Sequence, residues 1–162
     1  MARIIIGVMG VGSATPKEIN LAYQLGKSIA ENGWVLLTGG RKAGVMDAAS
    51  RGAKAGGGLT IGILPDNNTA GISEAVDIPI ITNLGNARNN INVLSSDVVI
   101  ACGMGLGTAS EVALALKNNK PVIFLNQTKL TYQFFNSLAG NKVFLAENVD
   151  KAIALVKQIL SE

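Results

Sequence analysis

Residues 97–111 read Asp97-Val98-Val99-Ile100-Ala101-Cys102-Gly103-Met104-Gly105-Leu106-Gly107-Thr108-Ala109-Ser110-Glu111. The apolar, β-branched residues 97–101 predict a buried strand, and residues 109–117 place apolar side chains at a helical spacing. A glycine-rich turn therefore joins a strand to a helix. The first N–H groups of a helix have no partner within the helix, and the helix dipole adds partial positive charge there. Such a junction is typical of a phosphate-binding site.

Strand and helix patterns alternate along the chain on both sides of this stretch. Thr15 followed by Pro16, with Glu18 three positions after Thr15, predicts the capped start of the first helix, and Asn148 is the predicted cap of the last. Hydrophobic runs predict strands, and apolar residues three and four apart predict helices. The predicted strands cover residues 3–9, 34–38, 59–64, 76–82, 97–101, 121–125 and 143–145, and the predicted helices cover 16–31, 44–55, 86–95, 109–117, 132–138 and 149–160.

This alternation is the pattern of an α/β protein. We predict a three-layer, Rossmann-like fold with a mainly parallel sheet flanked by helices on both faces. A length of 162 residues and a hydrophobic content of 48% suit one ligand-binding domain over residues 1–162. The segment 65–73 is rich in Asp, Asn, Thr and Gly, which predicts a mobile loop.

The composition excludes several classes of function. Apolar runs fall short of the roughly 20 residues of a membrane span, and a signal-peptide pattern is missing, so we expect a cytoplasmic protein without membrane contact. A formal net charge of +3 with few aromatic residues argues against nucleic-acid binding. Cys102 is the single cysteine and histidine is absent, which excludes an internal disulfide and predicts no metal site. Any acid–base chemistry falls to Glu, Asp, Lys or Tyr.

Three glycine-containing loops follow predicted strands. They are Gly10-Val11-Gly12-Ser13, Thr38-Gly39-Gly40-Arg41-Lys42-Ala43-Gly44 and the turn at 103–107. The carboxyl ends of parallel strands lie at one edge of a sheet, where ligands bind at the point of reversed strand order. Convergence of three such loops predicts a binding site. The glycine spacing does not fit a dinucleotide fingerprint, and the lysine of an ATP-binding P-loop is missing.

Arg88 and Glu111 both lie at predicted helix starts that face this crevice. They form a pair of site residues in one interpretation. In the other, Glu111 belongs to a cap with Thr108 as N-cap, and Arg88 is a surface charge. Arg41 and Lys42 fit solvated loop charges better than ligands, although either could reach a phosphate. Cys102 fits a small strand-end residue better than a nucleophile.

At these residues the chain resembles a known Rossmann-like superfamily. This superfamily includes the Lonely Guy cytokinin-activating phosphoribohydrolases and the molybdenum cofactor carrier proteins. Residues 39–46 are similar to its Gly-Gly-x-x-Gly-x-Met loop, and Arg88-Asn89 is similar to its Arg-Lys or Arg-Asn signature. The turn at 103–111 is similar to its Pro-Gly-Gly-x-Gly-Thr-x-x-Glu motif. The resemblance covers nearly the whole chain.

The resemblance implies two different functions. In the hydrolases, the Arg and Glu that match Arg88 and Glu111 are catalytic and cleave the N-glycosidic bond of a nucleoside 5′-monophosphate, while Thr108 and the backbone near residues 105–107 hold the phosphate. Here Gly103-Met104-Gly105 replaces Pro-Gly-Gly, and Asn89 follows the arginine. These departures and the short chain favour the carrier branch. Its members bind the molybdenum cofactor, a pterin with a phosphate monoester and a dithiolene, and form homo-oligomers.

We therefore expect a carrier or storage protein for the molybdenum cofactor. The alternatives are a phosphoribohydrolase that acts on a nucleoside monophosphate, with Arg88 and Glu111 as catalytic residues, and a nucleotide-sensing module whose ligand controls assembly. Expected partners are further copies of the chain in a dimer or tetramer, and molybdoenzymes or cofactor-synthesis proteins. The expected cofactor-binding residues are Gly10, Ser13, Gly39, Gly40, Arg41, Lys42, Gly44, Met46, Arg88, Asn89, Gly103, Gly105, Leu106, Gly107, Thr108 and Glu111.

Overall fold

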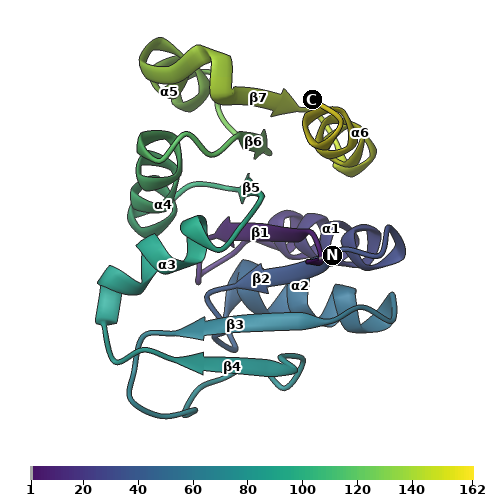
Figure 1. Cartoon of the computed structure of the whole chain (residues 1–162), viewed down its shortest axis with the longest axis vertical. Helices are drawn as coiled ribbons and strands as arrows, with labels where there is room; N and C mark the ends of the chain where they lie inside the picture. Colours follow the sequence, from purple (N-terminus) through teal and green to yellow (C-terminus); the bar gives the residue numbers. More distant parts are fainter. Residues whose placement is uncertain (1) are drawn as a thin grey trace.

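A computed structural model describes residues 2–162, which form an α/β, Rossmann-like structure around a seven-stranded sheet (Figure 1). The strand order is β4-β3-β2-β1-β5-β6-β7, and every pairing between neighbouring strands in this range is parallel. The predicted fold class is confirmed. The strands are β1 (Ile5–Gly10), β2 (Val35–Thr38), β3 (Thr60–Leu64), β4 (Ile78–Ile81), β5 (Val98–Cys102), β6 (Val122–Leu125) and β7 (Val143–Ala146).

Helices cover both faces of the sheet. Figure 1 shows α1, α2 and α6 on one side and α3, α4 and α5 on the other. In residues 2–162, none of the helices is long and apolar enough to span a bilayer. The helices are α1 (Pro16–Glu31), α2 (Gly44–Ala55), α3 (Arg88–Leu94), α4 (Leu106–Lys117), α5 (Lys129–Ala139) and α6 (Val149–Leu160), with short 3-10 turns at Gly85–Ala87 and Gly140–Lys142.

The core has two apolar layers, one on each face of the sheet. In β5, Ile100 belongs to the layer beneath α1, α2 and α6, whereas Val99 belongs to the layer beneath α3, α4 and α5. All five residues of β5 are buried. A parallel strand covered on both faces is apolar at every position, which explains the unbroken hydrophobic run in this part of the sequence.

Most predicted elements are present, with shifted ends at three helices. The helix α4 begins at Leu106, and Gly105, not Thr108, is its N-cap. The N–H groups of the first turn of a helix have no partner within the helix. The glycine-rich residues can therefore form this turn ahead of the residues that favour a helix more strongly. The predicted helix 86–95 divides into a 3-10 turn and α3, and α5 begins at Lys129 because Thr128 caps it.

The chain order places the candidate crevice beside β1. From β1 the chain builds outward through β2 and β3 to β4, and α3 then carries it back to β5 on the other side of β1. The strand order therefore reverses between β1 and β5, where Gly10 pairs with Cys102. Ligands of open α/β sheets bind at the carboxyl ends of such strands.

Candidate functional site

Two of the three glycine-containing loops contact each other directly at this edge. The Val45 N–H donates a hydrogen bond of 3.0 Å to the carbonyl oxygen of Val11, so the first turn of α2 has a partner inside the protein. Gly44 has a φ of +48°, and a Cβ there would lie 2.1 Å from the Val11 oxygen. Gly44 is therefore required for the close contact of the two loops.

Behind these loops, α3 and α4 bring five buried polar side chains together. We call them the polar cluster: Arg88, Asn89, Asn92, Thr108 and Glu111, each of which is at most 9% exposed. Burial of so many polar groups costs free energy unless they have hydrogen-bond partners. Arg88 is thus not the surface charge of the second interpretation, and Thr108 is not the N-cap that this interpretation required.

Arg88 is held by backbone carbonyl groups at the ends of β2 and β3. Its Nη1 atom donates to the carbonyl oxygens of Gly39 and Ile63, each at 2.8 Å. Gly39 makes this arrangement possible, because a Cβ there would lie 2.3 Å from Nη1. Burial lowers the pKa of the Arg88 guanidinium, and the charge of Glu111 acts in the opposite direction. The two hydrogen bonds thereby hold the positive charge of Arg88 in place within the polar cluster.

Glu111 is the buried carboxyl group of the polar cluster. The Asn92 amide donates to its Oε1 atom at 2.9 Å. Burial raises the pKa of Glu111 to about 7, while the hydrogen bond from Asn92 and the charge of Arg88 act to lower it. At neutral pH this group therefore exchanges between a charged acceptor and a neutral hydrogen-bond donor.

Three atoms of the polar cluster lack a hydrogen-bond partner. Within residues 2–162, the buried side-chain nitrogen and oxygen atoms without a partner are Arg88 Nε, Asn92 Oδ1 and Thr108 Oγ1. Buried polar atoms are almost always hydrogen-bonded in native proteins, so unpaired ones call for a partner outside the chain. All three belong to the same cluster, which makes this region a candidate binding site for a polar ligand.

The N-terminus of α4 adjoins the cluster through Thr108. Its N-cap Gly105 provides no side-chain hydrogen bond to the first turn. The side chains of Thr15, Thr128 and Asn148, in contrast, cap α1, α5 and α6. The free N–H groups and helix dipole of α4 are thus available to an anion.

The remaining predicted residues differ in the contacts that they already make within the protein. The Asn89 amide donates to Ser110 Oγ at 2.9 Å, so Asn89 supports the first turn of α4. Arg41 forms an ion pair with Asp66, and Lys42 forms one with Glu74. Gly10 lies beside Val45 and Cys102, and Gly40 has a φ of +77°. Met46 is half-buried. The exposed residues of the predicted set are Ser13, Leu106 and Gly107.

The predicted loop 65–73 is anchored at its second end. The Ser73 N–H donates to the carbonyl oxygen of Gly40 at 2.9 Å, and the Lys42 N–H donates to that of Gly71 at 2.8 Å. Arg41 and Ile72 form an isolated antiparallel bridge. The β2–α2 loop therefore anchors residues 71–73, and the mobility of the rest of the loop stays a prediction.

A hollow of about 340 Å³ lies on the other side of the Gly103–Gly105 turn, toward β6. A larger hollow, of about 420 Å³, lies at the opposite edge of the sheet, beside Asp97 and Pro121 where β5 and β6 begin, far from the free start of α4. The hollow of about 340 Å³ is the better placed for a ligand, because its lining residues Gly103 and Met104 lead into the start of α4. It is lined by Glu18, Gly103, Met104, Asn126, Gln127, Thr128 and Thr131.

Sequence reasoning missed several of these residues. Asn92 follows Arg88 by four positions, so both lie on one face of α3, and that spacing was the available signal. Glu18 was assigned to the cap of α1, which it does form. Asn126 and Gln127 follow β6 without a glycine, so a glycine-rich pattern does not mark them.

Known proteins resemble this chain over almost its whole length. Residues 3–153 match the SLOG cluster4 family. The structure of the molybdenum cofactor binding protein from the phototrophic bacterium Rippkaea orientalis has 63% sequence identity and a TM-score of 0.97, and the match covers 99% of each chain. That of the molybdenum cofactor carrier protein from Chlamydomonas reinhardtii has 54% identity and a TM-score of 0.95, over 99% of this chain and 100% of the other.

A more distant relative is an enzyme. The cytokinin riboside 5′-monophosphate phosphoribohydrolase of Rhodococcoides fascians is 26% identical in an alignment of 160 positions that covers 85% of this chain and 80% of the relative. Both branches of the resemblance noted in the sequence are therefore represented, with the higher identity on the carrier side.

Proposed function

The chain belongs to the SLOG cluster4 family, and we propose that within this family it binds and carries the molybdenum cofactor. The observation that carries this proposal is the full-length similarity to two proteins named for that activity. The cofactor is the cargo of the protein. A carrier must hold and protect such a cargo, and it needs no group that binds a transition state more tightly than the ligand.

We propose that the phosphate of the cofactor binds at the N-terminus of α4. The absence of a side-chain cap leaves the N–H groups of the first turn free for phosphate oxygens. Thr108 Oγ1 is buried without a partner in this turn and can donate a hydrogen bond to the same group. Arg88 contributes positive charge from below, and its Nε atom is also without a partner. The unpaired atoms thus match the chemistry of a phosphate monoester.

This proposal is tested by the substitution Thr108→Val. Valine has nearly the same shape as threonine but lacks the hydroxyl group, so the fold is expected to persist while cofactor affinity falls about tenfold, as for the loss of one hydrogen bond to a charged group. Purified protein is loaded with the cofactor, and retention is followed by the fluorescence of the oxidised pterin. Ser161→Ala, which removes an exposed hydroxyl group at the C-terminus, is the control. Equal retention by all three proteins would place the phosphate elsewhere.

A second candidate function is hydrolysis of a nucleoside 5′-monophosphate. It is favoured by the presence of Arg88 and Glu111 in one buried cluster, where a carboxyl group could stabilise an oxocarbenium-like sugar. Against it, Nη1 of Arg88 is already bonded to two carbonyl groups. Incubation with nucleoside monophosphates distinguishes the two functions. Release of free base that Glu111→Gln abolishes would establish an enzyme.

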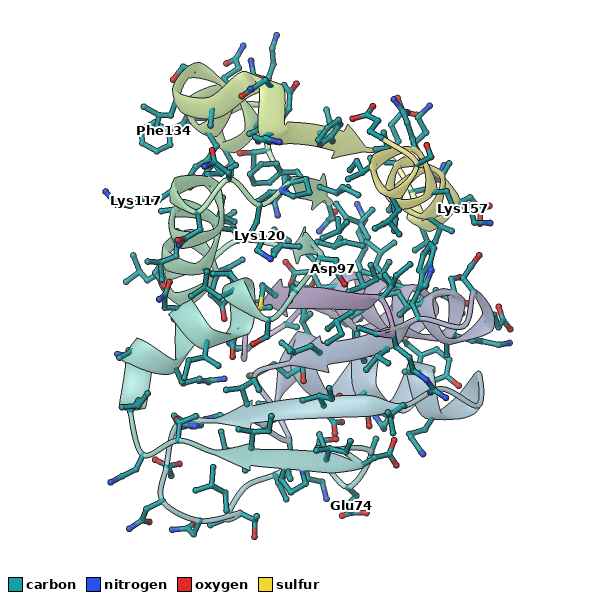
Figure 2. All side chains as sticks on the ribbon, viewed as in Figure 1. Glu74, Asp97, Lys117, Lys120, Phe134 and Lys157 are labelled. Atoms are coloured by element: carbon teal, nitrogen blue, oxygen red, sulfur yellow. The ribbon has the colours of Figure 1, made fainter. Side chains whose placement is uncertain are left out.

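We also propose that the chain forms a homo-oligomer through two apolar surfaces at opposite ends of the sheet. At one end, the side chains of Leu130, Phe134 and Leu138 follow one face of α5 and are 77%, 58% and 69% exposed. Figure 2 shows Phe134 and, on α4, Lys117 pointing away from the sheet. At the other end, the edge strand β4 exposes Ile78, Ile80 and Ile81. Exposed apolar surfaces of this kind are typical of interfaces, and two of them suit a tetramer.

A further inference from the structure

The hollow of about 340 Å³ beside the Gly103–Gly105 turn has the composition of a recognition site for a polar heterocycle. It lies at the carboxyl ends of β5 and β6, beside the first turn of α1, on the opposite side of the strand-order reversal from the loop 65–73. Its lining residues Gly103 and Met104 lead directly into Gly105, the N-cap of α4. The hollow and the proposed phosphate site therefore share one turn of the backbone.

The Glu18 carboxylate provides a fixed hydrogen-bond acceptor at this hollow. Its Oε2 atom accepts hydrogen bonds from the backbone N–H of Thr15 at 2.8 Å and from the Thr15 hydroxyl at 3.0 Å. These bonds hold the carboxylate in one orientation. The Oε1 atom makes no hydrogen bond within residues 2–162, and it lies so close to Gly103 that a Cβ there would be 2.5 Å away. Gly103, at a φ of +74°, thus leaves this acceptor open to the hollow.

Gln127 provides a second acceptor. Its Nε2 atom donates to the carbonyl oxygens of Ala101 and Gly103, which fixes the plane of the amide and leaves Oε1 as the atom available to a ligand. The two fixed side chains therefore present acceptors and no free donor. A ligand that pairs with both of these acceptors carries two N–H donors.

We propose that this hollow recognises the 2-amino-4-oxopyrimidine edge of a bound heterocycle, whose exocyclic amine and ring N–H donate to Glu18 Oε1 and Gln127 Oε1. Pterins carry this edge, so the inference rests on the proposed function and names the part of the cargo that is read. Guanine carries the same edge. The distance fits, because Gly103 and Gly107 are four residues apart and are separated by at most about 14 Å. A heterocycle in the hollow and its phosphate at α4 can therefore belong to one molecule.

The substitution Glu18→Gln reverses the hydrogen-bonding character of the hollow without removing the cap of α1. A glutamine at this position of a capping box still accepts from the backbone N–H of Thr15 through its carbonyl oxygen. Its amide nitrogen then occupies the place of Oε1 and opposes the amine of the ligand. Glu31→Gln, on the same helix but in an exposed ion pair with Lys27, is the matched control.

The test uses 6-hydroxymethylpterin monophosphate as a fluorescent probe that GMP or IMP displaces. These two nucleotides differ only in the 2-amino group. We expect GMP to displace the probe from the parent protein and from Glu31→Gln at a concentration at least tenfold lower than IMP, because a site built for a donor strongly rejects an analogue that lacks it. In Glu18→Gln the concentrations at which GMP and IMP displace the probe should agree within about twofold.

Equal displacement by GMP and IMP in the parent protein would overturn this inference, as would an unchanged preference in Glu18→Gln. Failure of the probe to bind a protein that still retains the molybdenum cofactor would also overturn it and leave the proposed function intact. Failure to bind either the probe or the cofactor would contradict both this inference and the proposed function. The comparison of nucleotides on the parent protein keeps the test decisive even if the variant folds poorly.

Discussion

A single glycine determines whether Arg88 can occupy its buried position. The guanidinium passes over Gly39 to reach the carbonyl oxygens of Gly39 and Ile63, and the space it uses would be filled by any other residue. The family-like Gly-Gly loop and the arginine signature, with Gly39 and Arg88 49 residues apart in the sequence, are thus parts of one arrangement. The resemblance named them separately, and the fold explains why they occur together.

We predict that Gly39→Ala destabilises the protein. The added Cβ would lie 2.3 Å from Arg88 Nη1 and 2.7 Å from Met46 Sδ, so the guanidinium must move and lose both carbonyl partners. The free energy of unfolding should fall by about 2–4 kcal/mol, measured by urea denaturation. Gly107→Ala is the control, because a Cβ there meets nothing within 4 Å and alanine favours a helix. Equal stability of both variants would contradict the role of Gly39.

The buried carboxyl group of Glu111 makes stability depend on pH. Its pKa rises from 4.5 to about 7 on folding, so the folded protein binds the proton more tightly than the unfolded chain. This contribution is fully present below pH 4.5 and is lost as pH rises through 7, with a total of up to about 3 kcal/mol. The chain has no histidine, so no imidazole titrates in the same range.

Glu111→Gln should remove this slope, because the amide stays neutral and still accepts from Asn92. Urea denaturation of both proteins at pH 5, 6, 7 and 8 measures the difference. The parent protein should lose stability relative to the variant over this range. Parallel profiles would show that the carboxyl group does not titrate near neutrality.

At the scale of elements, α4 differs from α5 in how it begins. Thr128 caps α5 with its side chain, whereas Gly105 leaves the start of α4 without a side-chain cap. Both helices follow buried strands at the same edge of the sheet. A capped helix has already satisfied part of its first turn, so α4 is the better anion site of the two.

We predict opposite effects of Leu106→Glu on stability and on binding. Leu106 is the first residue of α4 and is 94% exposed, so glutamate can replace it without a packing cost. A negative charge in the first turn favours the helix by about 0.3–1 kcal/mol but repels a phosphate. The melting temperature should stay equal or rise, while affinity for the phosphorylated cargo falls at least tenfold. Leu106→Gln, which lacks the charge, should bind as the parent does, and equal losses in both variants would contradict an anion site here.

At the scale of the whole molecule, the surface that remains apolar after folding predicts assembly. An apolar hollow of about 240 Å³ between α4 and α5, lined by Leu116, Phe135 and Leu138, continues the exposed stripe on α5. Phe134→Glu places a charge in this stripe and should lower the solution mass measured by light scattering to that of a smaller species. The control Gln158→Glu adds the same charge at an exposed position of α6, away from this surface. An unchanged mass for Phe134→Glu would exclude α5 as an interface.

The sequence predicted the elements well and the polar cluster only in part. Periodicity and caps placed α2 and α6 at the residues where they occur, because these signals are local. Arg88 and Glu111 were predicted as a pair, but the carbonyl groups that bind Arg88 come from two other strands. Asn92, which bonds to Glu111, was missed because its partner lies 19 residues away in another helix.

The sequence by itself determined the alternation of strands and helices, the glycine-rich turn between β5 and α4 and the absence of histidine chemistry, because these properties depend on neighbouring residues or on composition. Only the tertiary structure decided that Arg88 and Thr108 are buried with unpaired atoms, that Val11 closes the start of α2, and that Glu18 faces a hollow beside the Gly103 turn. Burial and hydrogen-bond pairing arise between segments distant along the chain, so the packed fold, and not the local pattern, fixes them.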